Sequence, residues 1–549
     1  MLSCRCRRAV PGIALLIGLM VASGAIAQSS PSLLEEANAA YESKDFRRAG
    51  ELFERSALTT RNPGEAYNAA CSYALAKLPE EAFGQLERAV RFGFMDADWM
   101  RQDGDLATLR EDRRWAPLAE KASALAARQA DFWQGPASEV PFREDLSLDD
   151  KLAGLATLWA EVKFNFVNFD LVPEVDWDAL YRESLPRVRQ SRSTVEYYRI
   201  LTRLMARLRD GHSNVYPPAE LRDEFWGRPL VATAWIEQQV IVTKVEEPDL
   251  GVGVGDRVVS IDGQPAADYA RRRVEPMQSA STDQDLASRT FGRGLLAGPA
   301  GSTVTLAVRN AEGELRQVEL TRRPLAEQAV MRPSHRPFEL SWLDGDIAHV
   351  RLNGFGTPAA ADGFAAAFDE LSSAKALILD VRENGGGNSS EGWRVLSHLT
   401  AEALPVASWY TRQYRPAHRA WGRGPSTFGR EGGVRRLTGP GPYTGPVAVL
   451  IGPRTFSAAE DFALTFDLLD RGLLIGEATG GSTGQPVSFT LPGGGSARVC
   501  AKRDLYPDGR EFVGVGILPD RVVAPTVADF RAGRDTVLEA AVEALQTPG

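Results

Sequence analysis

The feature that most constrains the fold is a pair of apolar runs that each end in a polar turn. "VAVLI" (447–451) leads into "GPRTFSAAEDF", and "KALILD" (375–380) leads into "VRENGGG". Short apolar runs bounded by turn residues are typical of strands buried in a sheet, and the amphipathic residues after Ser457 are typical of a helix. Strand and helix patterns alternate from about residue 338, so the sequence predicts an α/β domain over residues 335–530.

The segment before this domain is predominantly helical. With 549 residues, the chain is too long for one ordinary core, and several domains are expected. In residues 32–130, the spacing of Tyr73, Ala82, Leu86 and Ala89 resembles the second half of a tetratricopeptide signature, with a generic helical bundle as the alternative. A linker is predicted over 131–142, a second helical region over 143–222, and a C-terminal helix over 531–549.

Residues 225–325 differ from their surroundings because short β-type runs alternate there with turn residues. Within them, "GVGVGDRVVSIDGQPA" resembles the core of a PDZ domain. Such domains bind an extended peptide, often a C-terminus, by adding it as a strand at an open sheet edge. An unrelated small β-domain is the alternative.

The N-terminus predicts export. "MLSCRCRR" is basic, "AVPGIALLIGLMVASG" is apolar, and "AIA" precedes Gln28 as a cleavage site would. This is the pattern of a signal peptide over residues 1–27, and the expected location is periplasmic or secreted. An uncleaved membrane anchor is the alternative. No other stretch is long and apolar enough to cross a membrane, so no stable span is expected after cleavage.

Charge and cysteine content narrow the expected partners. The net charge of −9 argues against nucleic acid as a bulk electrostatic partner. Beyond the leader only Cys71 and Cys500 remain, which permits at most one disulfide. The sequence has no Cys/His cluster with zinc spacing, so neither a metal nor a cofactor is expected.

Ser457 has two interpretations. "SAAE" is a capping box, with Glu460 three residues after the serine. The serine also follows a strand of an α/β domain, at the edge where open sheets place their sites. The N–H of Ala458 at the helix N-terminus, and those of Gly385 and Gly386 in the glycine-rich turn, would suit an oxyanion hole. Without such a role, the glycine-rich segment is a plain turn.

Four motifs taken in order resemble one family. "DVRENGGG", "RTFSAAEDF", "GEATGG" and "YPDGREFVGVGILPD" resemble the tail-specific or carboxy-terminal processing protease superfamily, which includes the tricorn core and the interphotoreceptor retinoid-binding proteins. The resemblance covers about 145–530. It implies a crotonase-like α/β core with an inserted PDZ-like domain, and a serine nucleophile at Ser457.

The resemblance also indicates which residue is the base. Much of the superfamily uses a lysine about 25 residues after the serine, but here Thr479 is matched and the lysine position holds Ser482. Lys502, the only lysine after Ser457, lies beyond that loop. "RLRDGHSNVYPP" instead resembles the histidine motif of the tricorn-like branch, which implies His212 as the base.

The other four histidines are expected to lie in packed elements or in loops rather than at the site. His349 and His398 fall at positions of strands or helices that face packing, whereas His335 and His418 lie among Arg and Pro in loops.

The acidic residue that would orient His212 is left open. The tricorn-like pattern places a glutamate where this chain has Val513. Glu511, two residues earlier, would point to the same face of a strand and is the first candidate. Asp210 and Glu460 are the alternatives.

Together these patterns predict an exported serine peptidase that cleaves unfolded or C-terminal segments of proteins with a Ser457–His212 pair. The tetratricopeptide-like module would recruit a protein partner or the substrate. Two other functions stay open: a catalytically weak or inactive binding protein on the same fold, for a peptide or a small hydrophobic ligand, and a periplasmic scaffold.

Overall fold

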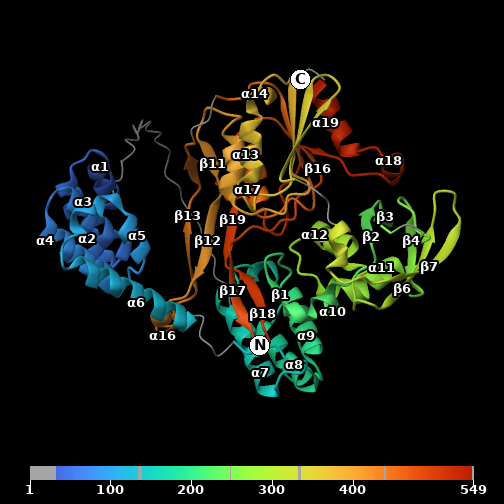
Figure 1. Ribbon diagram of the computed structural model, residues 1–549, viewed down its shortest axis with the longest axis horizontal. Helices are drawn as coiled ribbons and strands as arrows, with labels where there is room; N and C mark the ends of the chain where they lie inside the picture. The colour runs from blue at the N-terminus through green and yellow to red at the C-terminus, as the bar shows by residue number, and fades with distance from the viewer. Residues whose placement is uncertain (1–32, 134–138, 248, 332–335, 438–440, 547–549) are drawn as a thin grey trace, which may run out of the picture. The chain divides into compact units, whose positions relative to one another are not determined.

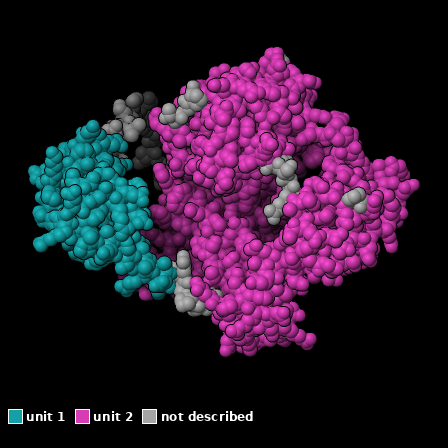
Figure 2. Space-filling model, viewed as in Figure 1, with its two compact units in different colours: residues 1–133 teal, residues 134–549 magenta. Residues whose placement is uncertain are grey.

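The computed structural model describes residues 33–133, 139–247, 249–331, 336–437 and 441–546. It divides into two compact units, residues 1–133 and 134–549 (Figure 2). The predicted leader and His335 lie outside the described residues, as does part of the predicted linker. Among the described residues, no helix has the length and apolar character needed to cross a membrane.

Unit 1 is helical. Its helices are α1 (Leu33–Glu42), α2 (Phe46–Thr60), α3 (Pro63–Leu75), α4 (Pro79–Phe92), α5 (Ala97–Gln102) and α6 (Trp115–Trp133). The side chain of Asn62 accepts hydrogen bonds from the first turn of α3, and Gly93 ends α4 in the left-handed conformation. Alanines and aromatic rings form the core, in which Tyr67 stacks on Phe94. The specific tetratricopeptide assignment stays a prediction.

Unit 2 begins with a helical region that ends in a short strand. Its elements are α7 (Leu148–Asn165), α8 (Trp177–Gln190), α9 (Thr194–Ala206), β1 (Asn214–Tyr216) and α10 (Arg222–Trp226). Buried Tyr197, Tyr198 and Leu201 on α9 pack in a core shared with residues near the C-terminal end of the chain, including Leu491 and Val499. The shared core joins segments that are about 300 residues apart in sequence.

A small β-domain follows. Its elements are β2 (Val231–Ile236), β3 (Gln239–Val245), β4 (Arg257–Ile261), β5 (Gln264–Pro265), α11 (Ala266–Tyr269), α12 (Asp283–Ala287), β6 (Thr303–Arg309) and β7 (Leu315–Thr321). The strand order is β2-β3-β4-β6-β7, with β5 paired to β4. The domain has a core of its own around Ile261 and Leu306. Its PDZ-like character stays a prediction.

The next domain is built on a six-stranded sheet. The order is β20 (Arg521–Val522), β16 (Leu473–Gly476), β15 (Val447–Ile451), β10 (Ala376–Asp380), β9 (Ile347–Leu352) and β8 (Phe338–Leu343). All neighbouring pairs are parallel except β8 with β9. β10 and β15 are buried along their whole length, as their apolar runs predict.

Helices cover both faces of this sheet (Figure 1). The core on one face includes residues of α13 (Ala359–Ala366), α14 (Phe368–Leu371), α15 (Ser389–Leu396) and α17 (Ala458–Leu468). The other face packs against α19 (Thr536–Gln546), which follows α18 (Val527–Arg531). This arrangement bears out the predicted α/β domain, and a crotonase-like subclass stays a prediction.

Three smaller sheets complete unit 2. Their elements are β11 (Leu404–Val406), β12 (Ser408–Gln413), α16 (Pro416–Ala420), β13 (Ser426–Arg430), β14 (Gly433–Arg435), β17 (Pro486–Leu491), β18 (Gly495–Cys500) and β19 (Lys502–Leu505). β1 pairs with β18, β12 lies between β13 and β19, and β11 pairs with β14. Cys71 and Cys500 are both buried free thiols, so no disulfide joins them.

Candidate active site

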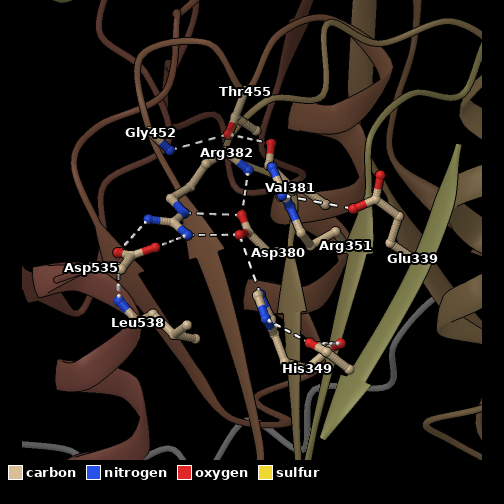
Figure 3. Close-up of polar contacts among 11 residues, drawn as sticks. Glu339, His349, Arg351, Asp380, Val381, Arg382, Gly452, Thr455, Asp535 and Leu538 are labelled. Carbon is tan, nitrogen blue, oxygen red and sulfur yellow. Dashed lines mark hydrogen bonds and ion pairs between the residues drawn. The ribbon is translucent and has the colours of Figure 1, made fainter. Parts of the chain in front are cut away.

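Ser457 occupies a strained turn between β15 and α17. Its φ of 57° and ψ of −126° place a non-glycine residue in a sparsely populated region, a conformation that persists only where the surroundings hold it. Thr455 helps to hold the turn, because its hydroxyl donates to the carbonyl of Val381 (2.9 Å) and accepts from the N–H of Gly452 (3.1 Å). Figure 3 shows this link between the ends of β10 and β15.

Glu460 binds the backbone of Ser457 as a capping residue would. The N–H of Ser457 donates to the Glu460 carboxylate (3.1 Å), and the N–H of Glu460 donates to the carbonyl of Ser457 (2.7 Å). The serine hydroxyl lies 3.1 Å from Nε2 of His212. The expected capping box of Ser457 and Glu460 is therefore present, and the serine hydroxyl also contacts a histidine from another part of the chain.

Strand pairing brings His212 to this place. β1 begins two residues after the histidine and pairs antiparallel with β18, Val215 opposite Ala497. The Ser213 hydroxyl also accepts a hydrogen bond from the N–H of Cys500 (3.1 Å). His212 and Ser457 are 245 positions apart and meet at hydrogen-bond distance.

The imidazole is enclosed. His212 is 4% exposed, its ring stacks on Phe456 with 4.7 Å between centroids, and Nδ1 lies 2.8 Å from the hydroxyl of Ser482. Burial, followed by the positive charges of Arg498, Arg289 and Lys502, lowers the pKa of His212 to about 3. The ring is therefore neutral near pH 7 and able to accept a proton.

The structure does not bring Glu511, the first candidate for orienting the histidine, to the imidazole. Its carboxylate accepts a hydrogen bond from Arg503 (3.1 Å), and the contact with Nδ1 is made by Ser482 instead. Asp210 accepts from the backbone N–H of His212 (3.0 Å), so it fixes the main chain rather than the ring. Glu460, the third candidate, binds N–H groups on both sides of the site.

Glu460 joins the turn at Ser457 to residues 479–482. Besides the N–H of Ser457, its buried carboxylate accepts from the hydroxyl of Thr479 (2.6 Å) and from the N–H groups of Gly481 (2.8 Å) and Ser482 (2.9 Å). Burial raises the pKa of Glu460 to about 7, against the opposing effect of these hydrogen bonds. This carboxyl group therefore links Ser457 to Ser482, and its protonation state changes near neutral pH.

The glycine-rich turn lies against Ser457. A Cβ added at Gly386, where φ is 93°, would come within 2.7 Å of the Ser457 Cβ, so the close approach requires glycine. The Gly386 N–H donates to the side chain of Asn384 (2.9 Å) and is already engaged. A side chain at Gly385 would point into open space. Ala458 is the first residue of α17. Its N–H group therefore has no acceptor within the helix.

A cavity of about 340 Å³ opens beside these turns. It is lined by Pro337, Asn353, Gly354, Gly356, Thr357, Glu383 and Arg454. Pro337 precedes the antiparallel strand β8 and the other lining residues follow β9, β10 and β15, so the cavity is at the carboxyl edge of the sheet, where open α/β sheets bind ligands.

The lysine alternative has no support in the contacts. Nζ of Lys502 forms an ion pair with Asp504 (2.7 Å), and the loop position usual for a lysine base holds Ser482. His349 and His398 are buried, as their sequence positions predict, and His398 packs on Phe364 and Phe368. His418 lies beside Trp421.

The sequence did not reveal two contributors to the site. One is the hydroxyl of Ser482, which contacts Nδ1 of His212. The one hint of this contact in the sequence is that Ser482 occupies the position of the lysine base in much of the superfamily. The other is the small β-domain: Thr282 donates to the carbonyl of Gly480 (3.1 Å), and Gln284 donates to those of Thr479 (2.9 Å) and Val515 (2.8 Å). The spacing of Thr282 and Gln284 in the sequence does not predict these contacts with residues 479–515.

Potential metal ligands occur in unit 1. Within the described ranges, the one group of three such side chains is Cys71, Asp103 and Asp105, and Tyr67 donates a hydrogen bond to Asp103 (2.8 Å). None of these side chains belongs to the arrangement around Ser457.

Comparisons with known proteins show which proteins this chain resembles. Residues 346–523 match the model of peptidase family S41. A tricorn protease homolog of Streptomyces coelicolor is 27% identical over 403 residues, which cover 67% of this chain and 30% of that protein. A carboxyl-terminal-processing protease of Picosynechococcus sp. is 23% identical over 401 residues, which cover 70% of this chain and 86% of the relative. Through this segment the chain is similar to the carboxy-terminal processing serine peptidases.

The solved structure of mature CPAF complexed with lactacystin supports the fold. It is 16% identical to this chain, with a TM-score of 0.57, and the match covers 73% of this chain and 98% of CPAF. At this identity the likeness concerns the fold. The chain spans about a third of the length of the Streptomyces relative, so its activity, substrates and partners have to be argued from the site.

Proposed function

We propose that this protein is an exported endopeptidase that cleaves unfolded or C-terminal segments of proteins with Ser457 as nucleophile and His212 as general base. The observation that carries the proposal is the 3.1 Å contact between the Ser457 hydroxyl and Nε2 of His212. A serine in a strained turn at a helix N-terminus, with a neutral histidine on its hydroxyl, is the arrangement that nucleophilic catalysis requires.

The chemistry follows from the two ring nitrogens. With its proton on Nδ1, His212 donates to the Ser482 hydroxyl, and Nε2 is free to accept from Ser457. The Ser457 oxygen then attacks the peptide carbonyl carbon while its proton passes to Nε2. As the C–N bond breaks, the leaving amine takes that proton, and an ester on Ser457 remains.

Deacylation reverses the same proton path. Water attacks the ester and gives a proton to Nε2, and the proton returns to Ser457 as its bond to the acyl carbon breaks. Ser482 is a positioning residue in this scheme, since it touches the imidazole and not the reacting atoms. A hydroxyl in this place holds the tautomer but brings no negative charge to the imidazolium.

The oxyanion would be held by backbone N–H groups. Ala458 and Gly385 are the proposed donors. Gly386 was expected to donate as well, but its N–H binds Asn384, so we propose that it serves by letting the turn approach Ser457. The cavity lined by Glu383 and Arg454 would receive the substrate on the same edge.

The other modules would serve substrate delivery. The inserted domain, if it binds peptides as a PDZ-like domain does, would present a substrate C-terminus. Unit 1, as a tetratricopeptide-like module, would recruit a partner or the substrate. The leader would place the enzyme in the periplasm or outside the cell.

The test uses the chain without residues 1–27 and an unfolded protein as substrate. We expect new termini in the products by mass spectrometry, and covalent labelling of Ser457 by a fluorophosphonate probe. Ser457→Ala should abolish both. Ser372→Ala is a matched control, because the hydroxyl of Ser372 donates to the carbonyl of Phe368 and contacts neither Ser457 nor His212.

Two results would oppose the proposal. Hydrolysis that persists in Ser457→Ala would place the nucleophile elsewhere. Absence of both hydrolysis and labelling in the folded chain would favour a binding protein on this fold. Peptides with free and amidated C-termini test separately whether the inserted domain presents a substrate C-terminus. If it does, amidation should raise KM and leave labelling of Ser457 unchanged.

A further inference from the structure

Residues 408–437, which we call the cationic hairpin, have an unusual composition. They contain seven arginines and a single carboxylate, Glu431, in a chain whose net charge is −9. Five aromatic rings are interspersed among these arginines. Neither the Ser457–His212 pair nor the core of the sheet uses this segment.

The cationic hairpin is anchored at one end. β12 pairs with β19 on one side and β13 on the other, and α16 lies in the connection between β12 and β13 (Figure 1). Arg412 donates to the carbonyls of Lys163 (2.7 Å) and Phe166 (3.2 Å), so it has a structural role. Trp409 packs edge-on against Phe428.

Beyond the anchor the side chains are exposed. Large apolar groups are among them: Trp421 is 66% exposed, Phe428 56% and Val434 65%. Tyr414 and Leu437 are also exposed. A soluble protein rarely gathers this many large apolar side chains on one short segment without a partner.

The exposed arginines lack counter-charges. Arg415, Arg419, Arg423, Arg430, Arg435 and Arg436 are all exposed. Within the described part of the chain, none of these six arginines forms an ion pair, and two of them, Arg423 and Arg435, lie over the rings of Trp421 and Trp393. The guanidinium groups are therefore available to an external anion.

We propose that the cationic hairpin docks the protein on an anionic lipid surface. Arginine binds lipid phosphates, while Trp and Tyr rings favour the boundary between headgroups and acyl chains. The exposed Val434 and Leu437 fit this boundary as well, and they would gain nothing from a purely ionic partner. The net charge of the chain is negative, so this segment differs in sign from the molecule as a whole.

Nucleic acid is the competing partner, since arginines and aromatic rings can also bind a phosphate backbone and stack on bases. Two observations favour lipid. The aliphatic side chains have no role in contacts with phosphate or bases. The predicted leader would also carry the protein away from nucleic acid.

The experiment is co-sedimentation of the chain lacking residues 1–27 with vesicles at ~0.1 M salt. One set of vesicles is phosphatidylcholine, and the other contains roughly 30% phosphatidylglycerol in phosphatidylcholine. We expect binding to the anionic set alone, weakened by added salt. The triple variant R415Q/R419Q/R423Q should bind about 100-fold more weakly, roughly fivefold for each arginine near the surface.

A matched control is R182Q/R187Q/R189Q, which removes three exposed arginines from α8. It should bind the anionic vesicles as the parent does. Trp421→Ala should weaken vesicle binding several-fold, and circular dichroism should show that all variants are folded. Both triple variants should keep parental hydrolysis of a soluble substrate, because none of the arginines touches the site.

Equal binding to both vesicle sets, or an unchanged affinity of R415Q/R419Q/R423Q, would overturn the proposal. So would duplex DNA binding as tightly as the anionic vesicles, with Trp421→Ala unaffected, since that pattern describes a general polyanion site. These outcomes are independent of Ser457, so they can be separated from a failure of the proposed peptidase function.

Discussion

Two buried histidines of this chain have opposite surroundings. His212 contacts a serine hydroxyl at each ring nitrogen, at 3.1 Å and 2.8 Å. His349 on β9 lies 3.4 Å from the carboxylate of Asp380 (Figure 3). Its other ring nitrogen lies 3.5 Å from the hydroxyl of Ser341. By composition alone, the Ser341–His349–Asp380 group looks more like a serine-hydrolase triad.

The network around His349 is nevertheless structural. Arg382 donates to both Asp380 and Asp535, and Asp535 accepts from the N–H of Leu538 in α19. Burial would raise the pKa of Asp380, but the hydrogen bonds from His349 and Arg382 lower it well below its usual range. Figure 3 shows how the group ties α19 to the sheet. The carboxylate beside His349 therefore belongs to a structural network that links α19 to the sheet.

The two histidine sites differ more in the backbone of the contacting serine than in the group on the other ring nitrogen. Ser457 has a strained backbone at a helix N-terminus, whereas Ser341 lies in an ordinary antiparallel strand at the sheet edge. The comparison teaches that strain and backbone N–H groups around a serine identify this site better than a carboxylate does.

The largest effect should come from the same substitution at both histidines. His212→Gln should lower kcat/KM at least ~10³-fold, because no other group can take the serine proton. His349→Gln should leave kcat/KM of the folded protein within about threefold and lower the unfolding free energy by ~1 kcal/mol. Steady-state kinetics and urea unfolding measure the two quantities. A large loss of kcat/KM in His349→Gln would contradict the structural role assigned to His349.

The serines beside the two histidines give the next comparison. Ser482→Ala should lower kcat roughly 10- to 100-fold with little change in KM, since the imidazole loses the group that fixes its tautomer. Ser341→Ala is the matched control and should leave kcat unchanged. Ser482→Thr keeps a hydroxyl and should recover part of the rate. If Ser482→Ala has full activity, the tautomer is held by another group.

A smaller effect is expected from pH. Because the pKa of His212 is about 3 and that of Glu460 about 7, the loss of kcat/KM between pH 8 and 6, roughly tenfold, should follow protonation of Glu460. A protonated carboxyl can no longer accept from all four donors around it. Glu460→Gln should have a lower but flat profile over this range. The proposal fails if the limb near pH 7 persists in that variant.

Stability should not follow activity over this interval. The pKa of Glu460 is raised in the folded state, so its contribution favours folding at low pH and is lost as pH rises through about 7. The pKa of His212 is lowered, so its contribution is present above about pH 6.5 and is lost as pH falls toward 3. At pH 6, thermal unfolding should therefore show that the protein is folded, while a kinetic assay at the same pH shows reduced activity.

Much of the architecture could be predicted from the sequence, because local patterns dictate it. The apolar runs of β10 and β15 and the turn residues after them indicate an α/β sheet with Ser457 at its edge. His212 could be selected through its resemblance to a family motif. Contacts that depend on distant segments could not be predicted: Glu511 pairs with Arg503, and Ser482 takes the place next to the imidazole.

The pairing of β1 with β18 has a consequence for the timing of activity. The strand that follows His212 pairs with β18, which ends at Cys500, and the turn at Ser457 also depends on residues 479–482. During synthesis from the N-terminus, these contacts with His212 and Ser457 therefore cannot form until β18 has been made. A molecule truncated before β18 would carry the serine without its proposed proton acceptor in place. Under the proposed mechanism, such a molecule would be inactive without a separate inhibitor.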